Sequence, residues 1–436
     1  MNARPGVNVV GYVTGNTGIG VVVREIIGAL LARGHPVSAF DVDVGLGRSR
    51  LDLRYESVCV PALEALPHRI TLWIAGAHAL EGPVAAICTK PALQRMFNAL
   101  YVWWELPHVS PVHAFAAEAF DALVTGSEFV QHAFRNSTGR VPVLLAETPV
   151  SIPEGVAGDR SRFGLTEGRF TVLTGFEPAS DPVRKNPWGS IEAFRRAFSG
   201  SDKAQLVVKL NNANSEGRPS AAVADLERLA ADDARIRLVK DRLAHSDLLS
   251  LYASCDVTLS LHRAEGLGLM PLEAMRLGKP TVATGWSGNM TYMNHSNSVP
   301  VRYKLVPTDQ QSVTYSPDAA GIASFWAEPD VAHAAQGLRY LADNSSAYRG
   351  MADAARRDSA AYHERALAMR FIDEIAALDV QHGLGPARNW IGVDHRLREL
   401  QKERQWQSLA LSEQMKARIG WRVQNLGAKL GFGRVR

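Results

Sequence analysis

The stretch from residue 256 to residue 284, DVTLSLHRAEGLGLMPLEAMRLGKPTVAT, constrains the fold more than any other part of the chain. It begins with alternating apolar residues, which are typical of a β-strand, and continues into a loop with two glycines. Pro271 suits the first turn of a helix, where its missing N–H is no loss, and Gly278 is placed to end that helix. A second apolar strand follows. This order of elements predicts an α/β protein.

Two carboxylates lie eight residues apart in this stretch, Glu265 in the glycine loop and Glu273 inside the helix. The first N–H groups of a helix lack partners and carry partial positive charge, so a helix start can bind a phosphate. Carboxylates instead accept hydrogen bonds from sugar hydroxyls. The stretch therefore favours a ligand with a phosphate between two sugars, such as a nucleotide-diphosphate sugar. The alternative is that both glutamates are ordinary solvated residues near a helix start, where the dipole favours acids.

Residues 265–273, EGLGLMPLE, resemble the E-x7-E motif of the family 4 retaining glycosyltransferases. Other similar positions lie at 104–107, 184–188, 206–209, 251–252, 256, 278–280, 287–289 and 326–330. The likeness is strongest over residues 165–345 and implies the GT-B fold, in which two Rossmann-like domains face each other across a cleft. It also implies a retaining, metal-independent enzyme without a cofactor. Such an enzyme moves a sugar from a nucleotide sugar to a glycan or lipid-linked glycan acceptor, as in bacterial surface-polysaccharide synthesis.

The same resemblance implies roles for individual residues. Glu273 would hold the nucleoside ribose, and Glu265 would act in catalysis by holding the donor sugar hydroxyls. Lys185 would stabilise the departing diphosphate. Lys209, at the end of the strand expected over residues 206–210, is a second candidate cation for that role, and the alternative is that it pairs with an acid in a surface network. The rest of the donor site would consist of Gly266, Leu267, Gly268, Leu269, Met270, Ser287 and Asn289. Relatives often have an arginine just after the first strand of this half, where this chain has Phe176; the neighbouring Arg184 could substitute for it.

The first half opens with a β-α-β pattern over residues 7–44. Its glycine-rich loop lacks the third glycine of G-x-G-x-x-G, since Val23 stands there. By resemblance, Gly18 and Gly20 would face the donor diphosphate, and the alternative is a merely tight turn. Asp41 and Asp43 form a D-x-D pair, a metal signature of a different glycosyltransferase fold, and are interpreted here as strand-end acids.

Two further positions in the first half are candidates for acceptor binding. His78 follows an apolar strand at residues 70–75, after which relatives often place a polar residue; the alternative is a solvated histidine. Trp104 and Glu105 combine an aromatic ring with a carboxylate, which suits the faces and hydroxyls of sugars. The alternative is that Trp104 lies in the core and Glu105 caps a chain end.

Length and composition agree with a soluble two-domain chain. The 436 residues suffice for two ordinary cores, and the alternating β and α segments predict parallel sheets. The expected divisions are an N-terminal acceptor domain (1–155), a donor domain (165–360), a helix returning to the first domain (361–379) and a tail (380–436). The three scattered cysteines, the missing signal peptide and the lack of a long apolar run predict a protein that is cytoplasmic or peripheral to the inner membrane.

The tail carries the excess of positive charge. Residues 380–436 hold 11 Lys and Arg against 4 Asp and Glu, in a chain whose net charge is +4. Five apolar residues between 415 and 430 share one helical face, and a basic amphipathic helix is typical of membrane-surface binding. The alternatives are docking on the chain's own domain and pairing with another subunit in a homo-oligomer. Nucleic acid is not expected, since no binding motif accompanies the charge.

The sequence favours a glycosyltransferase. The alternatives are a GT-B sugar epimerase or phosphorylase and, in a different class, a catalytically inactive sugar- or membrane-binding partner. Acceptor-dependent release of the nucleotide separates a transferase from an epimerase, and any release of the nucleotide separates a catalyst from a binder.

Removal of residues 400–436 should leave donor binding intact and reduce attachment to anionic liposomes, because each basic residue near such a surface contributes about 1 kcal/mol. Sedimentation with liposomes measures this, and attachment of the full chain should weaken as salt rises. Equal partitioning of both forms at low salt contradicts the membrane role. A change from dimer to monomer on truncation indicates a pairing helix instead.

Overall fold

The computed structural model describes residues 4–42, 52–139, 141–178, 180–200, 202–211, 213, 221–382 and 389–402. The chain divides between residues 387 and 388 into two compact units, and each is considered by itself.

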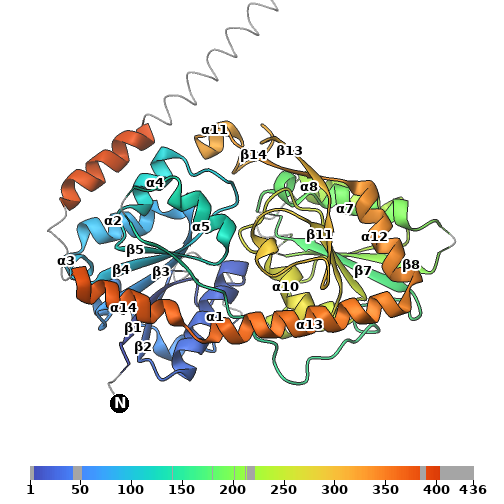
Figure 1. Ribbon diagram of the computed structural model, residues 1–436, viewed down its shortest axis with the longest axis horizontal. Coiled ribbons are helices and arrows are strands. Elements are labelled where there is room, and N and C mark those ends of the chain that lie inside the picture. Colours follow the sequence, from blue (N-terminus) through green and yellow to red (C-terminus); the bar gives the residue numbers. More distant parts are fainter. Residues whose placement is uncertain are drawn as a thin grey trace, which may run out of the picture. The chain divides into compact units, whose positions relative to one another are not determined.

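A six-stranded parallel sheet in the order β2-β1-β3-β4-β5-β6 forms the centre of the first half of the larger unit (Figure 1). Its strands are Val7–Gly11 (β1), Val37–Asp41 (β2), Ile70–Gly76 (β3), Phe97–Trp103 (β4), Ala122–Thr125 (β5) and Val143–Leu145 (β6). The helices are Gly18–Ala32 (α1), Glu81–Thr89 (α2), Pro91–Gln94 (α3), Pro111–Ala117 (α4) and Glu128–Arg135 (α5). Every residue of β1, β4 and β5 is buried, as expected for a parallel sheet covered on both faces.

A second six-stranded parallel sheet, in the order β12-β11-β10-β7-β8-β9, forms the centre of the other half. Its strands are Phe170–Phe176 (β7), Ala204–Leu210 (β8), Ile236–Val239 (β9), Val257–Ser260 (β10), Thr281–Thr284 (β11) and Val299–Val301 (β12). The helices are Pro182–Lys185 (α6), Pro187–Ala197 (α7), Ala221–Ala231 (α8), His245–Ala253 (α9), Leu269–Arg276 (α10) and Val331–Asp343 (α12). The strand, glycine loop, helix and strand predicted for residues 256–284 are thus confirmed, and Gly278 ends α10 with a left-handed φ of 71°.

An antiparallel hairpin that the sequence pattern does not predict follows the second sheet. It pairs Tyr303–Pro307 (β13) with Phe325–Pro329 (β14), and the short helix Pro317–Ala320 (α11) lies between them in sequence. Two strands alone are marginal in water, so the hairpin needs packing to be stable. Arg263 supplies part of it: its carbonyl accepts a hydrogen bond from Ala327 N–H, and its guanidinium pairs with Glu328 at 2.6 Å.

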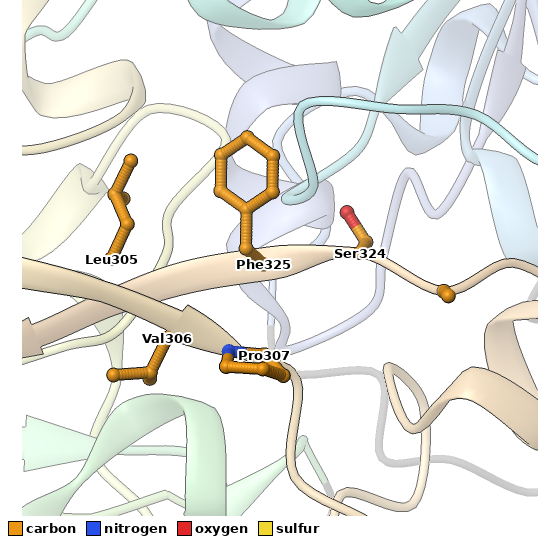
Figure 2. A pocket seen from close by; sticks show the side chains of 6 residues that line it. Leu305, Val306, Pro307, Ser324 and Phe325 are labelled. Carbon is orange, nitrogen blue, oxygen red and sulfur yellow. The ribbon is translucent and has the colours of Figure 1, made fainter.

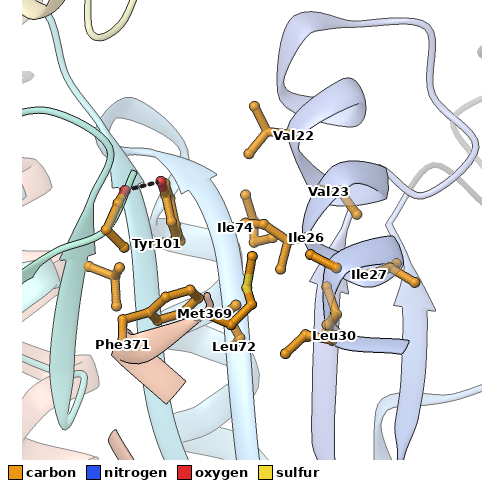
Figure 3. Close-up of a cluster of buried hydrophobic side chains, with 14 of the residues drawn as sticks. Val22, Val23, Ile26, Ile27, Leu30, Leu72, Ile74, Tyr101, Met369 and Phe371 are labelled. Atoms are coloured by element: carbon orange, nitrogen blue, oxygen red, sulfur yellow. Dashed lines mark hydrogen bonds between the residues drawn. The ribbon is translucent and has the colours of Figure 1, made fainter. Parts of the chain in front are cut away.

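Two helices, Ser345–Leu367 (α13) and Arg370–His382 (α14), follow the second sheet and complete the core of the first half. They replace the single returning helix expected over residues 361–379, because the chain breaks at Met369, whose φ is 46°. Figure 3 shows Met369 and Phe371 beside Leu72 and Tyr101 of the first sheet. Tyr362 also accepts a hydrogen bond from Thr148 N–H at 3.0 Å. The chain therefore returns to its first domain after building the second.

The smaller unit begins with a helical segment over residues 390–402, in which Asp394 pairs with Arg398 at 2.9 Å. The apolar face expected between residues 415 and 430 lies outside the described residues. None of the helices in the described ranges is long and apolar enough to cross a bilayer.

Candidate active site

The glycine loop after β10 turns sharply into α10. Gly268 has a φ of 83°, which a side chain would disfavour, and the first helical hydrogen bond runs from Leu272 N–H to its carbonyl. The N–H groups of Leu269 and Met270 precede that bond, so they point out of the helix start where an anion binds favourably. Tyr292 holds the turn by donating its hydroxyl to the Gly268 carbonyl at 2.6 Å.

A second loop, at residues 287–289, holds the backbone of Glu265 through hydrogen bonds. Ser287 Oγ accepts a hydrogen bond from Glu265 N–H, and Gly288 N–H donates to the Glu265 carbonyl, both at 2.8 Å. A Cβ on Gly288 would lie 2.0 Å from the Gly266 carbonyl oxygen, so only glycine allows the two loops to approach this closely. These contacts assign a supporting position to Ser287, which sequence analysis predicted as a donor-binding residue.

Asn289 also lies inside the protein. Its amide nitrogen donates to the Thr284 carbonyl at 2.8 Å, and its Oδ1 lies 3.0 Å from Nε2 of the buried His262. The side chain is fully buried, so in this structure it fixes the loop after β11.

Glu265 lies within a group of ionised side chains from both domains, which we call the charged cluster: Glu105, Arg184, Lys185 and Glu265. Lys185 Nζ lies 2.5 Å from Glu265 Oε1, and Arg184 Nη1 lies 3.3 Å from Oε2. Both cations lie on α6, whose N-cap Asp181 accepts a hydrogen bond from Arg184 N–H. Formal charges in the cluster cancel.

Glu105 connects the cluster to the first domain. It follows the end of β4, lies 3.8 Å from Arg184 Nη2, and accepts a hydrogen bond from the Tyr315 hydroxyl. The ring of Tyr315 in turn stacks beneath the Arg184 guanidinium, 5.6 Å from its centroid. The predicted acceptor residue Glu105 and the predicted catalytic residues Glu265 and Lys185 are thus brought together, and Arg184 is the centre that joins them.

Burial would raise the pKa of Glu265, but the positive charges of Lys185 and Arg184 outweigh it and hold the pKa at about 2. Glu265 is therefore ionised at neutral pH although only 8% of it is exposed. Arg184 is also buried, and among the described residues its Nε has no hydrogen-bond partner. An unsatisfied buried donor costs about 1–3 kcal/mol, which an incoming anion would recover.

Lys209 lies apart from these contacts at the end of β8. Its Nζ donates to the Leu210 carbonyl at 3.0 Å and to Asn211 Oδ1 at 2.8 Å. Burial lowers its pKa to about 8, against the opposing charges of Glu177 and Asp241. The structure places Lys209 at the carboxyl edge of the sheet, where ligands bind in such folds.

Glu273 lies on α10 with its carboxylate almost fully buried, and its partner is a residue that sequence analysis missed. His245 Nε2 lies 2.7 Å from Glu273 Oε1. His245 begins α9, directly after the loop that leaves β9. A histidine following the carboxyl end of a strand was the available signal, because that edge of the sheet carries the ligand.

The glycine loop of the first domain is held by side chains that accept hydrogen bonds from backbone N–H groups. Thr17 caps α1 by accepting from Gly20 N–H at 3.1 Å, and a Cβ on Gly20 would lie 2.3 Å from the Gly15 carbonyl oxygen. Gly18 is exposed at the first position of the helix. Asp41 accepts hydrogen bonds from the N–H groups of Val13 and Thr14, so it braces this loop.

The other two predicted positions follow the carboxyl ends of β3 and β4, two central strands of the first sheet. Trp104 is fully buried and donates to the His108 carbonyl at 2.9 Å, whereas His78 is exposed just after β3. Asp43 lies outside the described residues. Among the residues that are described, no three His, Cys, Asp or Glu side chains group as a metal site.

A cavity of about 420 Å³ lies on the hairpin, lined by Leu305, Val306, Pro307, Ala323, Ser324 and Phe325. Figure 2 shows Leu305 and Phe325 on one side of the strands. The ring of Phe325 lies 6.3 Å from that of Trp286, the residue before Ser287. No lining residue is charged, so the cavity does not suit a diphosphate, and the charged cluster remains the candidate for that group.

Comparisons with known proteins agree with this geometry. A family model described as glycosyl transferases group 1 matches residues 191–313. No curated protein matches the chain. Together, the family match and the fold support a glycosyltransferase of the GT-B fold.

Three similar solved structures illustrate the fold. Sucrose-phosphate synthase from Thermosynechococcus elongatus is 14% identical with a TM-score of 0.61, over 86% of this chain and 100% of that chain. Trehalose 6-phosphate synthase from Burkholderia multivorans is 12% identical with a TM-score of 0.57, over 87% and 98%. Anabaena HepE, crystallised with UDP-glucose, is 15% identical with a TM-score of 0.56, over 86% and 99%. The predicted fold of two Rossmann-like domains is confirmed.

The ion pairs of Glu265 should make the free energy of unfolding fall as pH drops. A carboxylate with a lowered folded-state pKa contributes stability above its unfolded pKa and loses it toward the folded value, here between about pH 4.5 and 2. The contribution is at most about 3 kcal/mol. Urea unfolding at pH 7 and pH 3 should show a smaller difference in Glu265→Gln than in the wild type. An exposed control, Glu192→Gln, should match the wild type; an unchanged difference in Glu265→Gln contradicts the assignment.

Proposed function

We propose that the protein is a retaining, metal-independent glycosyltransferase that moves a sugar from a nucleotide-diphosphate sugar to a glycan acceptor. The observation that carries the proposal is that Lys185 and Arg184 form ion pairs with Glu265, which lies in the loop just before α10. Two cations, a buried guanidinium N–H that lacks a hydrogen-bond partner among the described residues, and the first N–H groups of a helix together suit a diphosphate. A carboxylate at the same point suits the hydroxyls of the attached sugar.

Binding of the donor would exchange partners within the cluster. The diphosphate would take the positive charge of Lys185 and Arg184 from Glu265, and the carboxylate would then accept hydrogen bonds from the sugar. Since the cluster is neutral without a ligand, the donor must compete with an ion pair that the protein already makes. Glu273 would hold the ribose from the second turn of the same helix.

Transfer breaks the bond between the anomeric carbon and the phosphate oxygen, and it forms a bond from that carbon to an acceptor oxygen. The acceptor proton leaves on the departing phosphate, whose negative charge Lys185, Arg184 and the α10 N–H groups stabilise. Lys209 would add positive charge from the carboxyl end of β8. Attack from the face of the departing group retains the configuration.

Glu105 contacts Arg184 and Tyr315 of the second domain, so it would bring the first domain within reach of the transferred sugar. We assign it to the acceptor side. From charge alone, we also propose that residues 400–436 bring the protein to an anionic membrane surface. Synthesis of cell-surface polysaccharide is the role that would use both features.

Exchange of each glutamate for glutamine should separate the two roles. Glu265→Gln should bind the nucleotide at least as tightly as the wild type, because the diphosphate no longer competes with an ion pair, and should lower kcat by about 100-fold or more, because charge is lost at the reacting centre. Glu273→Gln should weaken donor binding about tenfold, because it loses a charged hydrogen-bond acceptor. Steady-state kinetics with an acceptor, and calorimetric binding of the nucleotide, measure both effects. Near-normal kinetics in both variants contradicts the site, and release of nucleotide without an acceptor indicates an epimerase or hydrolase instead.

Chelation should leave the activity in place. The helix start, Lys185 and Arg184 neutralise a diphosphate without a metal ion, so turnover in EDTA should equal turnover in untreated enzyme. A complete loss that added Mg²⁺ or Mn²⁺ restores would point to a metal-dependent mechanism and would return attention to Asp41 and Asp43.

A further inference from the structure

His245 and Glu273 form a buried polar pair on two helices of the second domain. The two side chains are 12% and 3% exposed, and their nearest atoms lie 2.7 Å apart. A buried carboxylate is costly without a partner, and this imidazole is the side chain that bonds it. The pair joins α9 to α10.

We propose that His245 is a positioning residue for donor recognition: it fixes the Glu273 carboxylate so that the other carboxylate oxygen is presented to the nucleoside ribose. The inference rests on the proposed function, because it assumes that Glu273 binds the donor. His245 itself would not touch the reacting atoms. Its effect on the donor would pass entirely through Glu273.

The geometry favours this role over simple packing. The hydrogen bond uses Glu273 Oε1, and within the described ranges Oε2 accepts no hydrogen bond, so this oxygen can serve a ligand. His245 is the first residue of α9, where no side chain caps the helix, so the imidazole is not used for capping. A ribose hydroxyl binds most tightly to an acceptor whose direction is already set, since less orientational freedom is lost on binding.

Charges from both domains surround the pair. Glu273 faces His245 from α10, and Glu25 and Arg24 approach from α1 of the first domain. Burial alone would lower the pKa of His245, but the hydrogen bond and charge of Glu273 raise it above its ordinary value. His245 therefore stays protonated to a higher pH than a free histidine. The ionic part of the attraction that holds Glu273 is present at low pH and is lost as pH rises through this raised pKa, while a neutral imidazole can still donate its N–H.

A double-mutant cycle tests whether His245 acts through Glu273. The probe is whichever of UDP, GDP and ADP the wild-type protein binds most tightly by calorimetry. His245→Ala should weaken that affinity about tenfold in the wild-type background and leave it unchanged in Glu273→Gln. His132→Ala, an exposed histidine on α5, is the matched control and should change neither affinity. Thermal unfolding of each variant separates weakened binding from a damaged fold.

Rescue and pH dependence provide the second measurement. His245→Gln keeps an N–H donor but cannot be charged, so it should restore the part of the affinity that the hydrogen bond supplies and not the part that the charge supplies. Wild-type affinity should fall as pH rises through the pKa of His245, and the glutamine variant should lack this step. NMR titration of the histidine should also show a lower pKa for His245 in Glu273→Gln than in the wild type.

The possible failures are distinguishable. An equal loss on His245→Ala in both backgrounds overturns the positioning role while Glu273 keeps its own. Unchanged affinity in Glu273→Gln instead overturns the ribose role within the proposed function, and the positioning role falls with it.

Discussion

The ion pairs between Glu265 and the cations of α6 are the interaction on which the site depends. They require that two loops of the second domain, at residues 263–268 and 287–289, lie against each other with no side chain between them, which Gly288 allows. They also require the first domain, because Ser127 donates to the Gly266 carbonyl at 2.6 Å and Glu105 approaches Arg184. The fold around the charged cluster can be understood as support for one buried carboxylate and its two cations.

This support explains why the side chains of several polar residues near the site bond other groups of the protein. Ser287 and Asn289 bond backbone groups or His262, and Asp41 bonds the glycine loop of the first domain. Such bonds satisfy buried polar groups that would otherwise destabilise the loops. A residue that keeps a loop in place can be as necessary for recognition as one that touches the ligand, and His245 extends the same principle to Glu273.

Much of the fold follows from the sequence, because continuous apolar runs separated by amphipathic helices specify parallel sheets. The glycine loop, α10 and Gly278 were predictable from local propensity. The break at Met369 was not, since methionine gives no signal for a left-handed conformation. Nor was the hairpin, which is stabilised by Arg263 from a distant loop. At the site, Glu265 and Lys185 were predictable by motif, whereas the junction of Glu105, Arg184 and Tyr315 depends on contacts across about 80 to 210 positions in sequence.

The most direct test of the central claim compares a nucleoside diphosphate with its nucleoside. Calorimetry of the wild type and Lys185→Met against UDP and uridine, or the corresponding pair for the preferred base, isolates the contribution of the diphosphate. Loss of a charged contact should weaken diphosphate binding about tenfold and leave nucleoside binding unchanged. Equal affinity of both proteins for the diphosphate would contradict the assignment of the charged cluster as its site.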